Sequence, residues 1–522
     1  MKIRVLALIL AAAVLLSGCM SYGGIIDYED MEYTRPDLTQ IQDSYDAFCQ
    51  TAAGDDAEAV IEAIYDFYDD YDWFYTCYNL ADIRYCSDLT DIYWEQEYNY
   101  CMELTDDVDA LLEEMYYVLA DSPCREALEA EEYFGEGFFD DYEGENLWDA
   151  AFSSLLEQEA QLQMEYYALS EEALAYPSGS VELYDACGQE MGQLLVELIK
   201  VRQDMAAYWN YDDYAQFAND FYYYRDYTPQ QADALLEEIR TELVELYRAV
   251  NADDVWTLAD VPSTEEETFA FVRGAAKAMG GTVWDGFQMM EGAGLYDIAY
   301  GENKYGASFE VYLTSYYSPF VFMNSSLTRY DCLTLAHEFG HFCNDYACYG
   351  SYAGIDVMEV FSQGMEYLSL CYGENTEDLT RLKMADSLCI YVEQAAFAQF
   401  EQEMYRLEGD DLSVEGLNGL YEEVILRYGF DSLGYDPREY VEITHFYTNP
   451  MYIISYVVSN DAALQLYQLE QEQPGAGLAK LEDNLESEEY YFLSFLTAAQ
   501  LESPFAEGRI KEVRETFEKV FG

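Results

Sequence analysis

Residues 336–342 have the sequence AHEFGHF and contain two of the only three histidines in a chain of 522 residues. On a helix, His337 and His341 project from one face about one turn apart, which suits two imidazoles that share a zinc ion. Glu338 follows the first histidine and can take a proton from water whose pKa zinc has lowered to about 7. The motif therefore predicts a helix that carries a catalytic metal, with hydrolysis of a peptide bond as the expected chemistry.

A catalytic zinc ion needs three protein ligands and one open position for water. The third ligand has to come from elsewhere, and residues 356–366 form a candidate helix with acidic residues on an apolar background. Spacing alone leaves Asp356, Glu359 and Glu366 as alternatives. Three cysteines near the motif lack a close C-x-x-C pair, so we interpret them as buried packing or disulfide partners: Cys332, Cys343 and Cys348.

The chain is extremely acidic, with 103 Asp and Glu against 24 Lys and Arg and a formal charge of -79. This charge excludes nucleic acid and anionic lipid as partners, because both require basic residues. A hydrophobic fraction of 51% rules out wholesale disorder. We expect a soluble monomer whose acidic surface, as a hypothesis, selects basic peptides.

Residues 1–18 have the pattern of a targeting segment, with Lys2 and Arg4 followed by an apolar run too short for a span of about 20 residues. Residues 16–19, LSGC, resemble a bacterial lipobox, which predicts cleavage before Cys19 and a lipid on its sulfur. An ordinary secretory signal is the alternative. Lipidation would anchor the protein at the outer face of the cell membrane and leave 11 of 12 cysteines to pair. Residues 19–44 are then a tether without a fold.

Beyond the tether the chain is predominantly helical in its spacing. Residues 45–200 are predicted to form an N-terminal helical lobe, and residues 201–522 a catalytic region. Thr228, Pro229 and Gln231 open a helix as N-cap, first residue and capping-box partner. Ser263 with Glu266 is a second predicted capping box.

The spacing changes before the metal motif, where residues 307–313 and 319–324 are rich in β-formers. We expect a small sheet next to the zinc helix. Its edge could pair with an extended peptide, because backbone hydrogen bonds do not depend on sequence; equally, the strands could be only structural.

Residues 334–341 and 359–363 together resemble the zinc metallopeptidases that include oligoendopeptidase F and thimet oligopeptidase. The resemblance implies that His337, His341 and Glu359 bind one zinc ion and that Glu338 is the general base. It extends through residues 227–229, 394–401, 412–418 and 445–452, and so covers about residues 200–520. The region before residue 200 is similar only in its helical character.

The same resemblance implies that His445 and a tyrosine in the segment that follows it stabilise the oxyanion of the transition state. The candidates are Tyr452 and Tyr456, since this chain has Ile454 where the family usually has a further tyrosine. Ser362, Gln363 and Asp356 are expected to orient the metal-bound imidazoles, which usually donate their second N–H to an acceptor.

The resulting prediction is a mostly α protein, with two helical lobes around a deep substrate channel and a small β-sheet next to the zinc helix. Its expected activity is zinc-dependent cleavage of short unfolded peptides. The alternative is a non-catalytic surface lipoprotein that has kept the peptide cleft and lost turnover.

Overall fold

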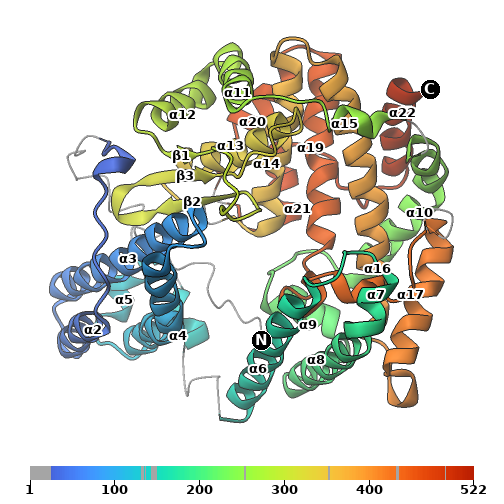
Figure 1. The fold of residues 1–522 in the computed structure, drawn as a ribbon. Coiled ribbons are helices and arrows are strands. Elements are labelled where there is room, and N and C mark those ends of the chain that lie inside the picture. The colour runs from blue at the N-terminus through green and yellow to red at the C-terminus, as the bar shows by residue number, and fades with distance from the viewer. Residues whose placement is uncertain are drawn as a thin grey trace.

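The computed structural model describes residues 25–130, 134–135, 137–142, 150–251, 254–350, 353–430, 434–487 and 489–522. The predicted signal segment and Cys19 lie outside these residues. The described chain is mostly helical with one small sheet, which confirms the predicted fold class (Figure 1). No helix among the described residues is both long and apolar enough to span a membrane.

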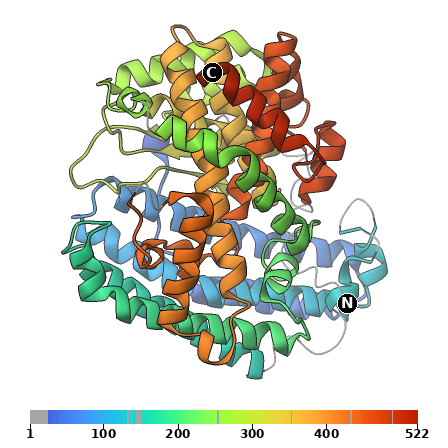
Figure 2. The same ribbon diagram turned by 90° about the vertical axis from the view of Figure 1, so that its right-hand side faces the viewer.

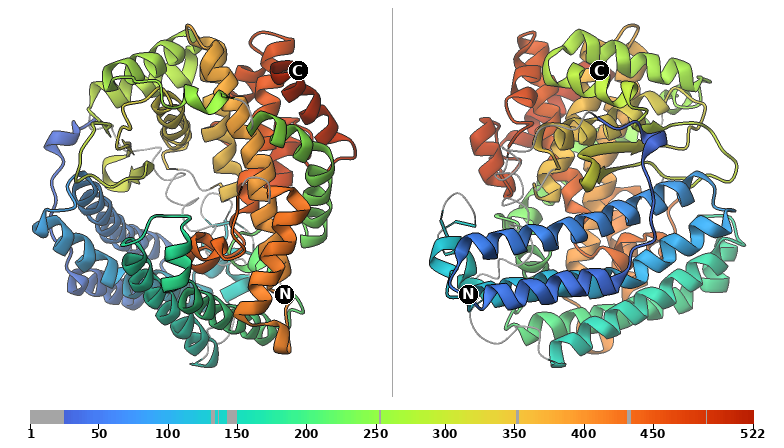
Figure 3. Two further views of the ribbon diagram at one scale, coloured as in Figure 1. Left: turned by 45° about the vertical axis from the view of Figure 1, so that its right-hand side comes forward. Right: turned by 90° about the vertical axis from the view of Figure 1, so that its left-hand side faces the viewer.

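The N-terminal helices have a hydrophobic core of their own, which includes the buried Phe48, Phe67 and Leu112. Each of the three long helices begins after an aspartate whose side chain accepts a backbone N–H of the first turn, a common way to satisfy a helix N-terminus. Figure 3 shows these helices lying together below the sheet. Their bounds are α2 Leu38–Ala52, α3 Ala57–Ser87, α4 Ile92–Ala120 and α5 Arg125–Leu128.

The described part of the predicted tether is not a bare connection. A short 3-10 helix spans Tyr28–Asp30, the N–H of Tyr28 donates to the carbonyl of Ala293 at 2.8 Å, and Met31 is buried. The ring of Tyr28 lies 4.4 Å from that of Phe320 in the sheet. Residues 28–31 therefore pack onto distant parts of the sequence, and helix α2 starts inside the predicted tether.

The predicted boundary at residue 200 falls inside helix α8 (Gln189–Tyr208), so no break in the chain marks it. The predicted capping box between Thr228 and Gln231 is formed. The N–H of Thr228 donates to Gln231 Oε1 at 3.0 Å, and the N–H of Gln231 donates to Thr228 Oγ1 at 3.2 Å. The second box lies one residue later than predicted, between Thr264 and Glu267. The helices of this region are α6 Ala150–Ala173, α7 Val181–Leu183, α9 Tyr214–Phe221, α10 Pro229–Asn251, α11 Glu265–Met279 and α12 Gly281–Gly292.

The sheet has three strands in the order β1-β3-β2. The two predicted strands are β2 (Phe309–Leu313) and β3 (Ser318–Phe322), which pair antiparallel, and the two-residue β1 (Tyr296–Asp297) pairs parallel to β3. Strand β2 is an edge, and α3 covers part of it because Asn79 Nδ2 donates to the carbonyl of Tyr312 at 3.0 Å. Pairing of this edge with a peptide stays a prediction.

Three helices position the candidate site: α13 (Asp331–Cys348), α14 (Ile355–Tyr372) and α19 (Ile454–Glu472). All three contribute to the larger hydrophobic core; α13 packs against the sheet, and α14 lies between α13 and α19 (Figure 1). The C-terminal helix α22 packs against α10 on the outside (Figure 2). The remaining helices are α15 Glu377–Cys389, α16 Ala395–Met404, α17 Val414–Tyr428, α18 His445–Thr448, α20 Ala476–Glu482, α21 Phe492–Ala499 and α22 Arg509–Phe521. The predicted channel between two lobes stays a prediction.

Candidate active site

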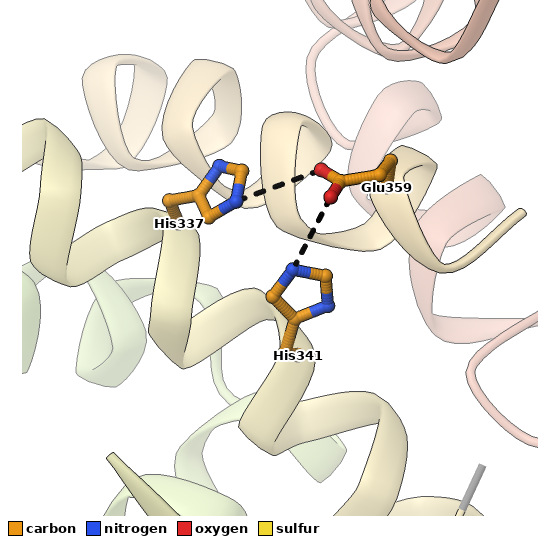
Figure 4. Close-up of side chains that lie close together, drawn as sticks. All are labelled: His337, His341 and Glu359. Carbon is orange, nitrogen blue, oxygen red and sulfur yellow. Dashed lines mark ion pairs between the residues drawn. The ribbon is translucent and has the colours of Figure 1, made fainter. Parts of the chain in front are cut away.

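Two histidines of α13 face one glutamate of α14 (Figure 4). The Nε2 atoms of His337 and His341 lie 3.5 and 4.0 Å from the two carboxylate oxygens of Glu359. These separations exceed the roughly 2.9 Å of a direct hydrogen bond, but a zinc ion with ligands at about 2.0–2.2 Å fits between the three groups. Within the described parts of the chain, this is the one group of histidine, cysteine and acidic side chains arranged to hold a metal.

The helix contact that brings these ligands together depends on Gly340, which lies between the two histidines. A Cβ atom there would lie 2.5 Å from the carbonyl oxygen of Phe361 and from the Cα of Ser362. Only glycine lets the backbone of α14 come this close to α13. Gly340 therefore determines how closely Glu359 can approach the two histidines.

Of the three acidic residues that spacing left open as the third ligand, Glu359 is the one in the cluster. Glu366 instead accepts from the other ring nitrogen of His337, with Nδ1 to Oε1 at 3.0 Å. This contact leaves Nε2 of His337 free to face a metal. Lys383, buried beside it, pairs with the second oxygen of Glu366 at 2.8 Å.

The residues predicted to orient the imidazoles have other partners, so that prediction is wrong. Ser362 Oγ donates to Glu359 Oε2 at 2.9 Å and thus orients the carboxylate. Gln363 Nε2 donates to Ser459 Oγ at 3.3 Å. Asp356 accepts from the hydroxyl of Tyr227 and pairs with a buried arginine.

The pKa values of the titrating groups in the cluster are strongly shifted. Burial disfavours charge on His337, but its hydrogen bond to Glu366 and the charge of Glu359 outweigh burial and raise its pKa to about 9. Burial lowers the pKa of His341 to about 4, against the charge of Glu359. Burial also opposes ionisation of Glu366, yet the charges of Lys383 and His337 hold its pKa below the ordinary value. A proton on His337 must therefore leave when a metal binds.

Glu338 is buried on α13 next to the ligands, with 7% of its surface exposed. Burial raises its pKa to about 7, against the charge of His337 and with the help of Glu359. A carboxyl group with this pKa can both accept and release a proton near neutral pH, as a general base and acid require.

The three residues expected to stabilise an oxyanion lie together. His445 Nε2 and the hydroxyl of Tyr456 form a hydrogen bond of 3.2 Å, and the ring of Tyr452 lies 5.4 Å from that of His445 and 5.2 Å from that of Tyr456. Burial, followed by the charge of Glu359, raises the pKa of Tyr456 to about 12 and that of Tyr452 further. Both phenols thus keep their protons at neutral pH and lie within the electrostatic reach of Glu359, while Ile454 between them is buried.

Solved peptidase structures share this architecture over nearly the whole chain. A protein assigned as an oligoendopeptidase F is 19% identical, with a TM-score of 0.77 and coverage of 95% of this chain and 98% of that chain. PZ peptidase A, solved with an inhibitor, is 17% identical, with a TM-score of 0.75 and coverage of 94% and 98%. A protein from Bacillus anthracis assigned as an oligoendopeptidase F is 18% identical, with a TM-score of 0.73 and coverage of 95% and 98%.

The chain has an oligoendopeptidase F-like fold. In addition, a family model described as the Peptidase M3 N-terminal domain matches residues 28–146. This match corrects the view that the region before residue 200 is similar only in helical character. Among curated proteins, none is similar enough in sequence to be matched.

Sequence reasoning placed Glu366 among the possible ligands and did not assign it to the second nitrogen of His337. A signal was available, because Glu366 follows Glu359 by seven residues, or about two helical turns, and so lies on the same face of α14. Lys383 gave no such signal, since it comes from another helix.

Proposed function

We propose that this chain is a zinc-dependent endopeptidase of the oligoendopeptidase F type that hydrolyses short unfolded peptides. The observation that supports it best is the convergence of His337, His341 and both oxygens of Glu359 beside a buried Glu338. The N-terminal family match and the oligoendopeptidase F-like fold support the same activity.

In this proposal, His337, His341 and Glu359 would hold one zinc ion, which would supply Lewis-acid chemistry to the scissile carbonyl and to the attacking water. Glu338 takes a proton from the attacking water and passes it to the leaving amine. His445 and the tyrosines Tyr452 and Tyr456 donate hydrogen bonds to the carbonyl oxygen as it gains negative charge. Each such donor contributes roughly 3 to 4 kcal/mol where water is excluded.

The location is part of the proposal. A lipid on Cys19 would anchor a monomeric enzyme at the outer face of a bacterial membrane, where it would meet peptides and no nucleic acid. The support is the lipobox-like sequence at residues 16–19 and the formal charge of -79.

The test compares the wild type with Glu338→Gln. Zinc content is measured by atomic absorption, and activity by cleavage of a quenched fluorescent peptide library. We expect both proteins to bind one zinc ion and only the wild type to cleave peptides, because glutamine cannot accept the proton. Zinc binding without cleavage by the wild type would favour the non-catalytic alternative, and equal turnover in the two proteins would refute the role of Glu338.

A further inference from the structure

The turn that leads into Tyr452 contains a strained residue. Met451 has φ of 65°, in the left-handed region that side chains other than glycine rarely adopt, and it is buried. Such a conformation is strained and persists only where the surroundings fix it. The contacts that fix the backbone of Met451 therefore also fix the backbone position of Tyr452.

A buried carboxyl group and a buried guanidinium bind the backbone of Met451 from opposite ends. Its N–H donates to Glu401 Oε1 at 2.7 Å, and its carbonyl accepts from Arg225 Nη1 at 2.8 Å. The hydroxyl of Tyr223 donates to the carbonyl of Pro450 at 2.7 Å. Hydrogen bonds from a charged group are stronger than neutral ones, so the guanidinium of Arg225, in the segment after α9, holds the turn most firmly.

Arg225 also bonds α14, the helix of Glu359, and α19, the helix of Tyr456. Its Nη2 donates to Ser455 Oγ in α19 at 2.8 Å, one residue before Tyr456. Its Nε donates to Asp356 Oδ2 in α14 at 3.3 Å, about one turn before Glu359. One guanidinium thus bonds the metal-ligand helix, the turn of Tyr452 and the helix of Tyr456.

We propose that Arg225 is a positioning residue that fixes the metal-ligand helix α14 relative to the oxyanion donors Tyr452 and Tyr456. The inference rests on the proposed peptidase function. Arg225 is only 6% exposed, and its N–H groups donate to α14, to the turn of Tyr452 and to α19, so it acts through other residues. A rigid fork of five N–H donors suits this task, and the single ammonium of a lysine cannot replace it. The precision matters because a displacement of about 1 Å can cost about 10²-fold in rate.

The test uses Ser455→Ala, which removes one of these contacts and leaves the guanidinium in place, and Arg225→Lys, which removes the fork. The matched control is Ser318→Ala, which deletes an equally buried hydroxyl in β3 that donates to the carbonyl of Tyr316 at 2.9 Å and bonds neither α14 nor α19. The readouts are kcat, KM, inhibition by a phosphinic peptide that mimics the transition state, and zinc content. In the metal-free protein, the fluorine NMR signal of 3-fluorotyrosine at position 452 reports its surroundings directly.

We expect Ser455→Ala to lower kcat about tenfold and Arg225→Lys about 10²-fold, with little change in KM or zinc content. Binding of the phosphinic peptide should weaken by the same factors, because a transition-state mimic depends on the same donors. The fluorine signal should move in both variants and stay in the control.

Ser455→Ala decides the question if Arg225→Lys fails to fold. Wild-type kcat together with an unmoved fluorine signal in Ser455→Ala would overturn the inference. An equal loss of kcat in Ser318→Ala would also overturn it, because the effect would then be general destabilisation. If the wild type neither binds zinc nor cleaves peptides, the proposed function is wrong. The fluorine signal of the variants without metal would still decide the positioning role.

Discussion

Replacing Gly340 by alanine should separate the metal ligands. The added Cβ would meet backbone atoms of α14, at 2.5 Å from the oxygen of Phe361 and the Cα of Ser362 and 2.9 Å from the nitrogen of Ser362. Backbone atoms cannot rotate away, and carbon atoms prefer to be about 3.5–4.0 Å apart. Helix α14 must therefore retreat by about 1 Å, and Glu359 moves with it.

Two effects on stability oppose each other in Gly340→Ala. Alanine gains about 1 kcal/mol over glycine in a helix, whereas overpacking costs about 1–3 kcal/mol, so we expect a net loss of about 1 kcal/mol. Metal binding is more sensitive, because zinc sites tolerate only about 0.2 Å in ligand distance. A retreat by about 1 Å takes the carboxylate out of reach of an ion held by His337 and His341, and zinc affinity should fall by about 10²-fold or more.

The assay is competition for zinc against a chromophoric chelator, with thermal unfolding in parallel. Gly274→Ala is the matched control, since Gly274 lies in the interior of α11 and its added Cβ would meet no atom within 4 Å. The control should keep its zinc affinity and gain up to about 1 kcal/mol of stability. If Gly340→Ala binds zinc as tightly as the wild type, the contact between α13 and α14 does not set the reach of Glu359.

Three further changes test other parts of the site and the chain. Glu366→Gln should lower zinc affinity about tenfold in the same competition assay, because the acceptor for His337 loses the charge that Lys383 balances. Burial raises the pKa of Glu401 from 4.5 to about 8, so the folded chain keeps a proton that the unfolded chain loses. The contribution of Glu401 to stability is therefore greatest below pH 4.5 and falls as pH rises towards 8, by up to about 5 kcal/mol at ~1.4 kcal/mol per pH unit. Glu401→Gln should remove this fall, as measured by urea unfolding at pH 5 and 9. Cys19→Ser should abolish palmitate labelling and release the protein from the membrane fraction.

Each of these predictions has an outcome that contradicts it. Unchanged zinc affinity in Glu366→Gln would mean that the contact with His337 does not support metal binding. A parallel pH dependence of unfolding in the wild type and Glu401→Gln would show that this carboxyl group titrates normally. Membrane retention and labelling of Cys19→Ser would favour an anchor other than this sulfur.

Local rules predicted the parts of the fold that depend on neighbouring residues. The Thr228 box and the two longer strands follow from side-chain chemistry within a few positions. The second box was misplaced by one residue because Ser263 with Glu266 and Thr264 with Glu267 have the same spacing. The structure decides between them, since the N–H of Ser263 donates to the carbonyl of Leu327 at 2.9 Å and Thr264 becomes the N-cap.

In the candidate site as well, some features could be predicted from the sequence and others depend on packing. Helical periodicity alone places His337 and His341 on one face, and the resemblance supplied Glu359. Spacing within α14 places Glu366 on the same face as Glu359, but it does not show which nitrogen of His337 each carboxylate meets, because that depends on how α13 and α14 pack. The contact of Asp356 with Arg225, 131 positions away in the sequence, also depends on packing, and no spacing within one helix reveals it.

The distribution of positive charge sharpens the hypothesis that acidity selects substrates. Among the described residues, five basic side chains are buried, so they screen little of the surface charge: Arg202, Arg225, Lys304, Lys383 and Arg509. Their burial leaves an exterior with a higher ratio of acidic to basic residues than the 103 acidic and 24 basic residues suggest.

The electric field of this acidic surface should raise the rate of encounter with cationic peptides tenfold or more at about 0.01 M salt, where the screening length is about 30 Å. We therefore expect kcat/KM for a lysine-rich peptide to fall steeply as salt rises to about 1 M, where that length is about 3 Å, and kcat/KM for a matched glutamate-rich peptide to rise. Equal, salt-independent cleavage of the two peptides would show that the acidity serves solubility and does not select substrates.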